Sequence, residues 1–289
     1  MGQKLQAGKF VLLLLILLSA AMVACVPRDQ SLTSLQRDGK IRIGYAVEAP
    51  FAYAHAGGQV TGESPDLARY VVARLGIDSI QWVQTDFNAL ITDLERGRFD
   101  VIAAGMFITP ERATRVAFSE PTFHVQQALL VAQGNPKHLL SYQQAVAHPD
   151  AVIAVLSGSV EAILLKEMAL PRQRTLAVPD ARTGLVAVET GLADALALSA
   201  STLRWIRASG QFQTTEIAEP FEPPDATLTR GLGYGAFGFR RGDEQLRRAW
   251  NDVLKELIGT SEHLRLIAPF GFGVAELPGS ITTAEVLRQ

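Results

Sequence analysis

Cysteine is nearly absent from this chain of 289 residues, in which Cys25 is the only one. A lone cysteine cannot form an intramolecular disulfide, so a disulfide-stapled fold is excluded and Cys25 needs another role. An excess of positive charge is also missing, because 27 Lys and Arg face 29 Asp and Glu, with a net charge of −2 and a pI of about 6.2. Nucleic-acid-binding domains are usually basic. The composition therefore argues against a nucleic-acid partner and leaves small molecules open.

Patterns that would indicate a metal or a nucleotide cofactor are missing too. The five histidines are scattered, without the spacing of metal ligands. They are His55, His124, His138, His148 and His263. The glycines of "GYGAFGF" do not open a helix, as a dinucleotide-binding fingerprint requires. We therefore expect neither a metal nor a cofactor.

The N-terminal residues have the features of an export signal. Lys4 and Lys9 flank the start of the chain, and a mostly apolar run of 15 residues follows, shorter than the roughly 20 that a membrane-spanning helix needs. The run ends in "MVAC", which resembles the lipobox of bacterial lipoproteins, whose cysteine is lipidated and becomes the mature N-terminus. We expect a lipoprotein signal peptide at 1–24, a lipid on Cys25 and a polar tether over 25–39; an uncleaved signal anchor is the alternative. Either places the rest of the chain outside the cytoplasm, at the periplasm or cell surface, and attached to the membrane.

Short apolar runs alternate with helical patterns from residue 40 onward. The strand-like runs are 41–47, 79–84, 100–106, 127–132, 152–158 and 234–240, and the main helical patterns are 65–76, 88–98, 160–170 and 243–259. In the last helix, the apolar residues recur at spacings of 3 and 4, which places Leu246 and Trp250 on one buried face. Continuous apolar strands between helices predict an α/β fold, with mostly parallel sheets covered on both faces. The count fits two lobes of about 100 residues each.

The segment "GMFITPERATR" begins with Gly105, at the end of a predicted strand. Ligands of open α/β sheets bind beyond the carboxyl ends of the strands, and a glycine there allows a close approach to the backbone. Thr109 suits the N-cap of a helix and Pro110 its first position, so free N–H groups would face a ligand. Arg112 adds a planar donor fork for a carboxylate, with Phe107 beside it. This predicts a site for a small anion with an apolar body; a plain helix start with a surface arginine is the alternative.

Other strand ends carry side chains that complement such a site. Glu48 and Phe51 follow the first predicted strand, and Phe87 follows the second. In the second half, "LSGSVEA" places Ser159 and the N–H of Val160 at a helix start. Aromatic rings with one acid at neighbouring strand ends form a box that can hold a delocalised cation, through cation–π contacts of about 0.5–2 kcal/mol each. The sequence thus predicts a ligand that carries both a carboxylate and a cationic group.

Several of these segments resemble one known family. "GYAVEAPF", "LERGRFDVIAAGMFITPERATRVAFSEPTF", "GLADALALS" and "YGAFGFRRGDEQLRRAWNDVLKEL" are similar to family 3 of the extracytoplasmic solute-binding proteins of ABC importers. The resemblance extends over about residues 36–275. Within the family, "IAAGMFITPER", "LSGSVE" and "PFGFGVAELPG" resemble most the binding proteins for ectoine and hydroxyectoine.

The resemblance implies a two-lobe periplasmic-binding-protein-like fold of type II. Lobe 1 would comprise 40–124 and 233–278, and lobe 2 would comprise 125–232. Two hinge crossovers, near 122–127 and 228–234, would let the lobes close on a ligand. The protein would not be an enzyme, and its partners would be a small-molecule ligand and the subunits of an ABC permease.

The resemblance also assigns roles in the site, with one departure from the family pattern. Arg112 would bind the ligand carboxylate, together with the helix start at Ser159 in the other lobe. Amino-acid-binding members usually carry an Asp five residues after the Asp of their "DA" motif, where it binds the α-ammonium group. Here Asp194-Ala195 is followed at that offset by Ser199, and a neutral hydroxyl does not neutralise an ammonium group.

Ectoine and hydroxyectoine fit this departure, because they pair a carboxylate with a cyclic amidinium. Glu48 would accept hydrogen bonds from the ring, while Phe51, Phe87 and Phe107 cover its faces. Two alternatives stay open. The ligand could be a polar amino acid or a betaine-like solute, or the chain could be an enzyme similar to prephenate or arogenate dehydratases, in which Glu48 would be the general acid.

Overall fold

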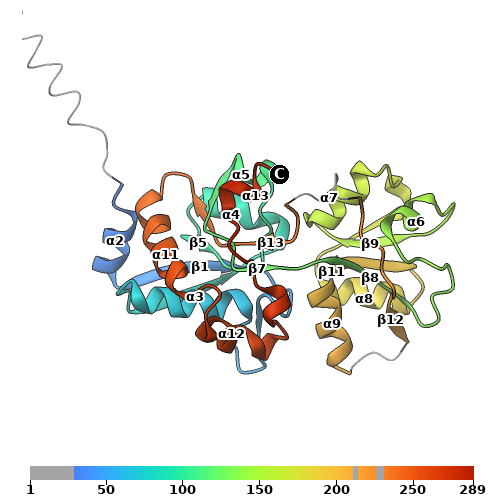
Figure 1. Cartoon of the computed structure of the whole chain (residues 1–289), viewed down its shortest axis with the longest axis horizontal. Helices are drawn as coiled ribbons and strands as arrows, with labels where there is room; N and C mark the ends of the chain where they lie inside the picture. The colour runs from blue at the N-terminus through green and yellow to red at the C-terminus, as the bar shows by residue number, and fades with distance from the viewer. Residues whose placement is uncertain (1–28, 211–213, 226–230) are drawn as a thin grey trace, which may run out of the picture. The chain divides into compact units, whose positions relative to one another are not determined.

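The computed structural model describes residues 29–210, 214–225 and 231–289. The predicted signal peptide, the predicted lipid attachment at Cys25 and residues 228–230 of the second expected crossover lie outside the described residues. The chain divides into two units, Met1–Gln30 and Ser31–Gln289, and the second contains the whole folded body (Figure 1). Within the described residues, no helix combines the length and the apolar character needed to cross a membrane.

The segments 40–118 and 238–240 form a five-stranded sheet in the order β4-β1-β5-β14-β6, which we call the sheet of lobe 1. Its strands are β1 (Lys40–Tyr45), β4 (Ser79–Gln84), β5 (Val101–Ile102), β6 (Val116–Phe118) and β14 (Gly238–Arg240). Strands β1, β4 and β5 are parallel, whereas β14 runs antiparallel to β5 and β6. A short hairpin of β2 (Tyr53–Ala54) and β3 (Val60–Thr61) adds to this lobe.

Helices cover both faces of the lobe 1 sheet. They are α3 (Glu63–Arg74), η1 (Phe87–Ala89), α4 (Leu90–Glu95), α5 (Pro110–Ala113), α11 (Glu244–Leu257), α12 (Ser261–Ile267), η3 (Ala268–Phe270) and η4 (Val274–Glu276). Leu67 of α3 and Trp250 of α11 belong to the same core cluster as Ile41 and Ile43 of β1. Leu90 of α4 packs in a different cluster with Ile102. The predicted apolar face of α11 is therefore confirmed, with Leu246, Trp250, Leu254 and Leu257 fully buried.

The segment between 127 and 217 forms another five-stranded sheet, in the order β10-β9-β11-β8-β12, which defines lobe 2. Its elements are β8 (Gln127–Ala132), α6 (Tyr142–Ala147), β9 (Ile153–Leu156), α7 (Val160–Glu167), η2 (Arg172–Arg174), β10 (Thr175–Val178), α8 (Ala181–Glu189), β11 (Ala195–Ser199), α9 (Ala200–Ala208) and β12 (Thr215–Ile217). Strands β9, β10 and β11 are parallel, and β8 runs antiparallel to β11 and β12. The predicted α/β fold with two covered sheets is confirmed, with antiparallel strands added to each sheet.

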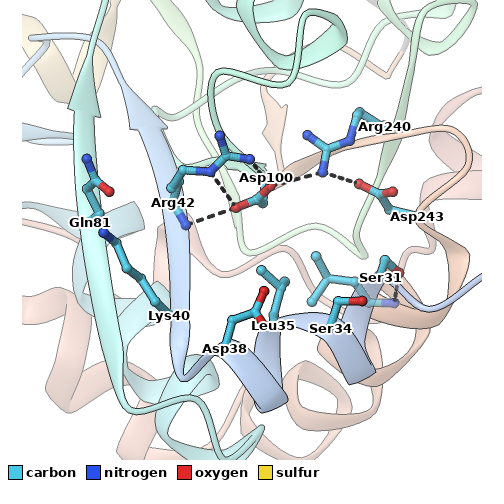
Figure 2. A pocket seen from close by; sticks show the side chains of 11 residues that line it. Ser31, Ser34, Leu35, Asp38, Lys40, Arg42, Gln81, Asp100, Arg240 and Asp243 are labelled. Carbon is cyan, nitrogen blue, oxygen red and sulfur yellow. Dashed lines mark hydrogen bonds and ion pairs between the residues drawn. The ribbon is translucent and has the colours of Figure 1, made fainter.

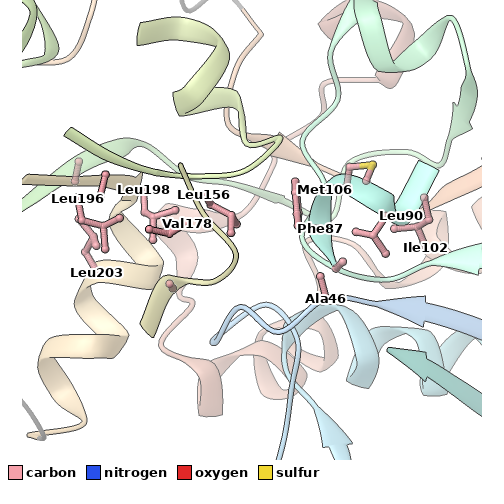
Figure 3. Close-up of a cluster of buried hydrophobic side chains, with 14 of the residues drawn as sticks. Ala46, Phe87, Leu90, Ile102, Met106, Leu156, Val178, Leu196, Leu198 and Leu203 are labelled. Carbon is pink, nitrogen blue, oxygen red and sulfur yellow. The ribbon is translucent and has the colours of Figure 1, made fainter. Parts of the chain in front are cut away.

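Two short strands, each at a point where the chain passes from one sheet to the other, form a separate ribbon. It pairs β7 (Phe123–His124) antiparallel with β13 (Tyr234–Gly235). The chain leaves the lobe 1 sheet after β6 and enters the lobe 2 sheet at β8, where one crossover was expected. One continuous cluster of buried side chains also spans both lobes, with Phe87 and Met106 from lobe 1 and Leu156 and Leu198 from lobe 2 (Figure 3).

Three local predictions from the sequence are wrong or incomplete. Residues 31–38 form helix α2 (Ser31–Asp38), not a tether, since Leu32 and Leu35 pack on the lobe 1 core and the Leu246 N–H donates to Ser31 Oγ at 3.1 Å. The expected strand 234–240 divides into β13 and β14. The C-terminal tail, for which no element was predicted, forms α13 (Thr283–Val286) and buries Val286.

Candidate functional site

One cavity collects every residue that the sequence suggested for ligand binding. It lies between the lobes and has a volume of only about 20 Å³, far below the roughly 300–1,000 Å³ of small-molecule sites, so the lobes must separate to admit a ligand. Its lining consists of Glu48, Phe51, Phe87, Gly105, Phe107, Arg112, Ser159, Val160, Glu161 and Ser199. Nine of these ten were expected to bind a ligand, and Glu161 is the addition. The structure therefore brings the expected residues together, and their function remains a proposal.

Arg112 is held in the cavity by its own helix start and by backbone carbonyls. The side chain of Thr109 caps α5 by accepting from the Arg112 N–H at 3.2 Å, with Pro110 at the first position. One guanidinium nitrogen donates to the Phe107 carbonyl at 2.8 Å, and the other terminal nitrogen donates to the Gly158 carbonyl of lobe 2 at 2.9 Å. Burial lowers the pKa of Arg112 to about 10, so the group stays charged at neutral pH.

The expected dipole of the helix start contributes less than the sequence suggested. Helix α5 has only four residues, and its capped N–H at Arg112 is already bonded to Thr109. A helix this short has a small macrodipole, because few peptide units add up. The guanidinium itself therefore provides the positive charge of the cavity.

A relay of hydroxyl groups joins the two lobes at Glu48. The Ser199 hydroxyl caps α9, accepting from the Thr202 N–H at 3.2 Å, and donates to Thr202 Oγ1 at 3.1 Å. The Thr202 hydroxyl then donates to Glu48 Oε1 at 2.8 Å. Ser199, which stands where amino-acid-binding members usually carry an acid, is therefore hydrogen-bonded to Thr202 of its own helix start. Thr202 was overlooked because it lies one helical turn after the motif.

Two carboxylates lie buried in the cavity with perturbed titration. Burial raises the pKa of Glu48 to about 7, and the nearby Glu161 adds to the rise, while Thr202 and Arg112 oppose it. Burial also raises the pKa of Glu161, opposed by hydrogen bonds at the start of α7 and by Arg112. Glu161 could have been found from the sequence, because it is the third residue of the capped "SVE" start of α7.

The three phenylalanines of the cavity fall into two groups. Phe51 and Phe107 meet edge to face at 6.5 Å between ring centroids, and Phe123 and Phe272 support Phe51 from behind at 4.9 and 5.6 Å. Phe87 is separate, with the Arg112 guanidinium 5.5 Å from its ring centroid. The cavity therefore offers an apolar wall beside a cation and two acids, an arrangement suited to a small zwitterion.

Replacing Gly105 with alanine tests how tightly this wall is built. Gly105 has φ +63°, and an added Cβ would lie 2.4 Å from Cγ of Phe51. Overpacking costs about 1–3 kcal/mol and the left-handed backbone about 1 more, so we expect the free energy of unfolding to fall by about 2–4 kcal/mol in urea denaturation. Gly76→Ala is the control, since its φ is +68° and nothing lies within 4 Å. Equal losses in both variants would contradict the packing argument.

Comparisons with known proteins agree with the fold. Residues 41–272 match the sequence profile of the bacterial extracellular solute-binding proteins, family 3. A probable amino-acid ABC transporter periplasmic-binding protein of Sinorhizobium fredii is 33% identical, over 92% of this chain and 88% of that protein. The crystal structure of EhuB in complex with hydroxyectoine superposes with a TM-score of 0.81 at 32% identity, covering 89% of this chain and 98% of EhuB. The membrane-bound lytic murein transglycosylase F of Idiomarina loihiensis is 30% identical, over 54% of this chain but only 34% of the enzyme.

Proposed function

This chain belongs to the bacterial extracellular solute-binding proteins, family 3, and from that premise we propose that it delivers ectoine or hydroxyectoine to an ABC importer. As a member of the family, it is a solute-binding protein of the amino-acid type of ABC transporter. The choice of ligand rests on the cavity and on the resemblance to EhuB, whose crystal structure holds hydroxyectoine.

The observation that carries the proposal is that one cavity holds both Arg112 and Glu48 and has a serine, Ser199, at the position where amino-acid-binding members usually carry an acid. Arg112 binds the ligand carboxylate through its free donor positions. Glu48 accepts from the amidinium ring, and the Phe51–Phe107 wall covers its face. An α-ammonium group would meet the hydroxyls of Ser199 and Thr202, which already bond to each other, so an ordinary amino acid is poorly served.

We propose that the two lobes form a ligand-binding clamp that is held at the membrane surface. Lobe 1 comprises 40–124 and 233–278 and lobe 2 comprises 125–232, with the described tail to 289 added to lobe 1. Family members act outside the cytoplasm. A signal peptide at 1–24 and a lipid on Cys25 would tether the protein near its permease.

Isothermal titration of residues 26–289 with ectoine and hydroxyectoine tests the proposed function. We expect measurable heat with one site per chain, and a rise in melting temperature with either ligand. The same assay with arginine, glutamine and glycine betaine separates the ectoine proposal from its closest alternative. Absence of both heat and thermal shift at millimolar ectoine would refute the assignment.

A raised pKa at Glu48 also suits a general acid, which is the property an enzyme similar to prephenate or arogenate dehydratases needs. We propose that the protein is not an enzyme, because Glu48 is bonded to Thr202 and has the role of ligand acceptor. Release of product from prephenate or arogenate by the purified protein would overturn this view.

A further inference from the structure

The cavity holds one more carboxylate than its cation balances. Glu48 comes from lobe 1, Glu161 from lobe 2, and Arg112 supplies the positive charge. All three are buried, with exposed fractions of 8%, 3% and 7%. If both acids were ionised, the cavity would have a net charge of −1, and a zwitterion would leave that charge unchanged.

Direct pairing does not neutralise either acid. The terminal nitrogens of Arg112 donate to the carbonyls of Phe107 and Gly158, and in the described part of the chain no ion pair within 4.0 Å joins Arg112 to a carboxylate. Glu48 is instead bonded to the neutral hydroxyl of Thr202. A buried charge without a partner is costly, and such a group takes up a proton instead.

The other groups that face the two acids do not supply the missing charge. Arg112 faces both of them, and Glu111 lies beside Arg112 on α5. From α6, the hydroxyl of Tyr142 approaches Glu161, and its own pKa is raised well above 10, so it stays neutral. Ser159 on α7 donates a neutral hydrogen bond. No lysine or histidine lines the cavity.

We propose that Glu161 is a ligand-binding residue that shares one proton with Glu48, so that binding of a zwitterion is linked to uptake of a proton from solvent. The inference rests on the proposed function for the choice of ligand. The proton brings the carboxylate pair to a single charge, which then balances Arg112, while the ligand's own charges cancel. When the proton is on Glu161, its O–H can donate a hydrogen bond from lobe 2 to a hydroxyl or carboxylate of the ligand.

Titration calorimetry with ectoine in buffers of different ionisation enthalpy measures this uptake. Between pH 6.5 and 8.5 we expect the wild type to take up close to one proton at the upper end and to lose affinity by about threefold or more. In Glu161→Gln, which removes one acid and keeps the shape, we expect proton uptake near zero, and an affinity for ectoine that varies by less than about twofold over the same pH range. Glu167→Gln is the matched control, because this residue is exposed on the same helix α7. Equal proton uptake by the wild type and Glu161→Gln would overturn the inference.

A second measurement needs no ligand. An acid whose pKa is raised on folding makes the protein less stable as pH rises from the unfolded value, near 4.5, through the folded value. Melting temperature should therefore fall between pH 5 and 8, and the fall should be smaller in Glu161→Gln than in Glu167→Gln by at least about 2 °C. Identical pH profiles would overturn the role of Glu161. If ectoine does not bind, the proposed function is refuted, while the melting profiles still test whether Glu161 takes up a proton on folding.

Discussion

Arg112→Ala should weaken ligand binding by at least tenfold, and by about 30-fold if about 2 kcal/mol is lost. The guanidinium is the positive group of the cavity lining, and its planar fork matches a carboxylate. Truncation also leaves the Gly158 carbonyl of lobe 2 without the donor that links it to lobe 1. Isothermal titration of the wild type and the variant with ectoine measures the change.

Two further variants show whether the effect belongs to the site. Arg115→Ala removes the next arginine of the same segment, which is exposed and paired with Glu95, and it should bind like the wild type. Arg112→Lys keeps the charge but loses the planar guanidinium, so its affinity for ectoine should lie between those of the wild type and Arg112→Ala. A folded Arg112→Ala protein with wild-type affinity would show that the carboxylate binds elsewhere.

Asp100→Ala should lower the free energy of unfolding by about 2–3 kcal/mol, because it removes charge-assisted hydrogen bonds from a buried carboxylate. The loss stays below that of a fully buried ion pair, since the side chains of Arg42 and Arg240 are 39% and 28% exposed. Asp100 is 4% exposed and lies between two arginines at the base of lobe 1 (Figure 2). Its carboxylate accepts two hydrogen bonds from the Arg42 side chain, at 2.7 and 3.1 Å, and one from Arg240 at 3.1 Å, and the Arg42 N–H adds a fourth at 3.0 Å. Together these contacts join β1, β5 and β14. Urea denaturation measures the loss.

A surface pair provides the comparison for Asp100. Glu244 and Arg248 meet at 2.6 Å on the exposed side of α11, with side chains 56% and 72% exposed. Such pairs contribute less than about 1 kcal/mol, so Glu244→Ala should be nearly neutral. Asp100→Ala with the same small loss as Glu244→Ala would mean that the two arginines find other partners.

The fold was largely readable from the sequence because its long elements follow simple periods. The strand over 79–84 and the strand over 127–132 have the predicted bounds, and α11 buries the predicted face. The strand predicted over 100–106 is too long, since β5 has two residues and an apolar run cannot show where pairing ends. The two-residue strands β2, β3 and β7 were missed, because so short a run shows no period. Helix α2 was missed because Leu32 and Leu35 alone, one turn apart, make too weak a pattern.

The candidate site was readable for a different reason. Glu48, Phe87 and Arg112 each follow a predicted strand, and parallel strands bring their carboxyl ends to one edge. Glu161 could have been added from the capped "SVE" start of α7, whereas Thr202 could not be assigned in this way, because it lies inside the first turn of α9. Which side of that turn faces the cavity depends on how the two lobes meet, and the sequence does not contain that information locally.

The hydrogen bonds that span the cavity also govern how a solute enters and leaves. Thr202 of lobe 2 is bonded to Glu48, and Arg112 is bonded to Gly158 of lobe 2, while the side chains around the cavity are buried. No solute reaches the interior until both bonds have broken and the lobes have moved apart. The speed of capture and release is therefore set by this separation and not by diffusion to the surface.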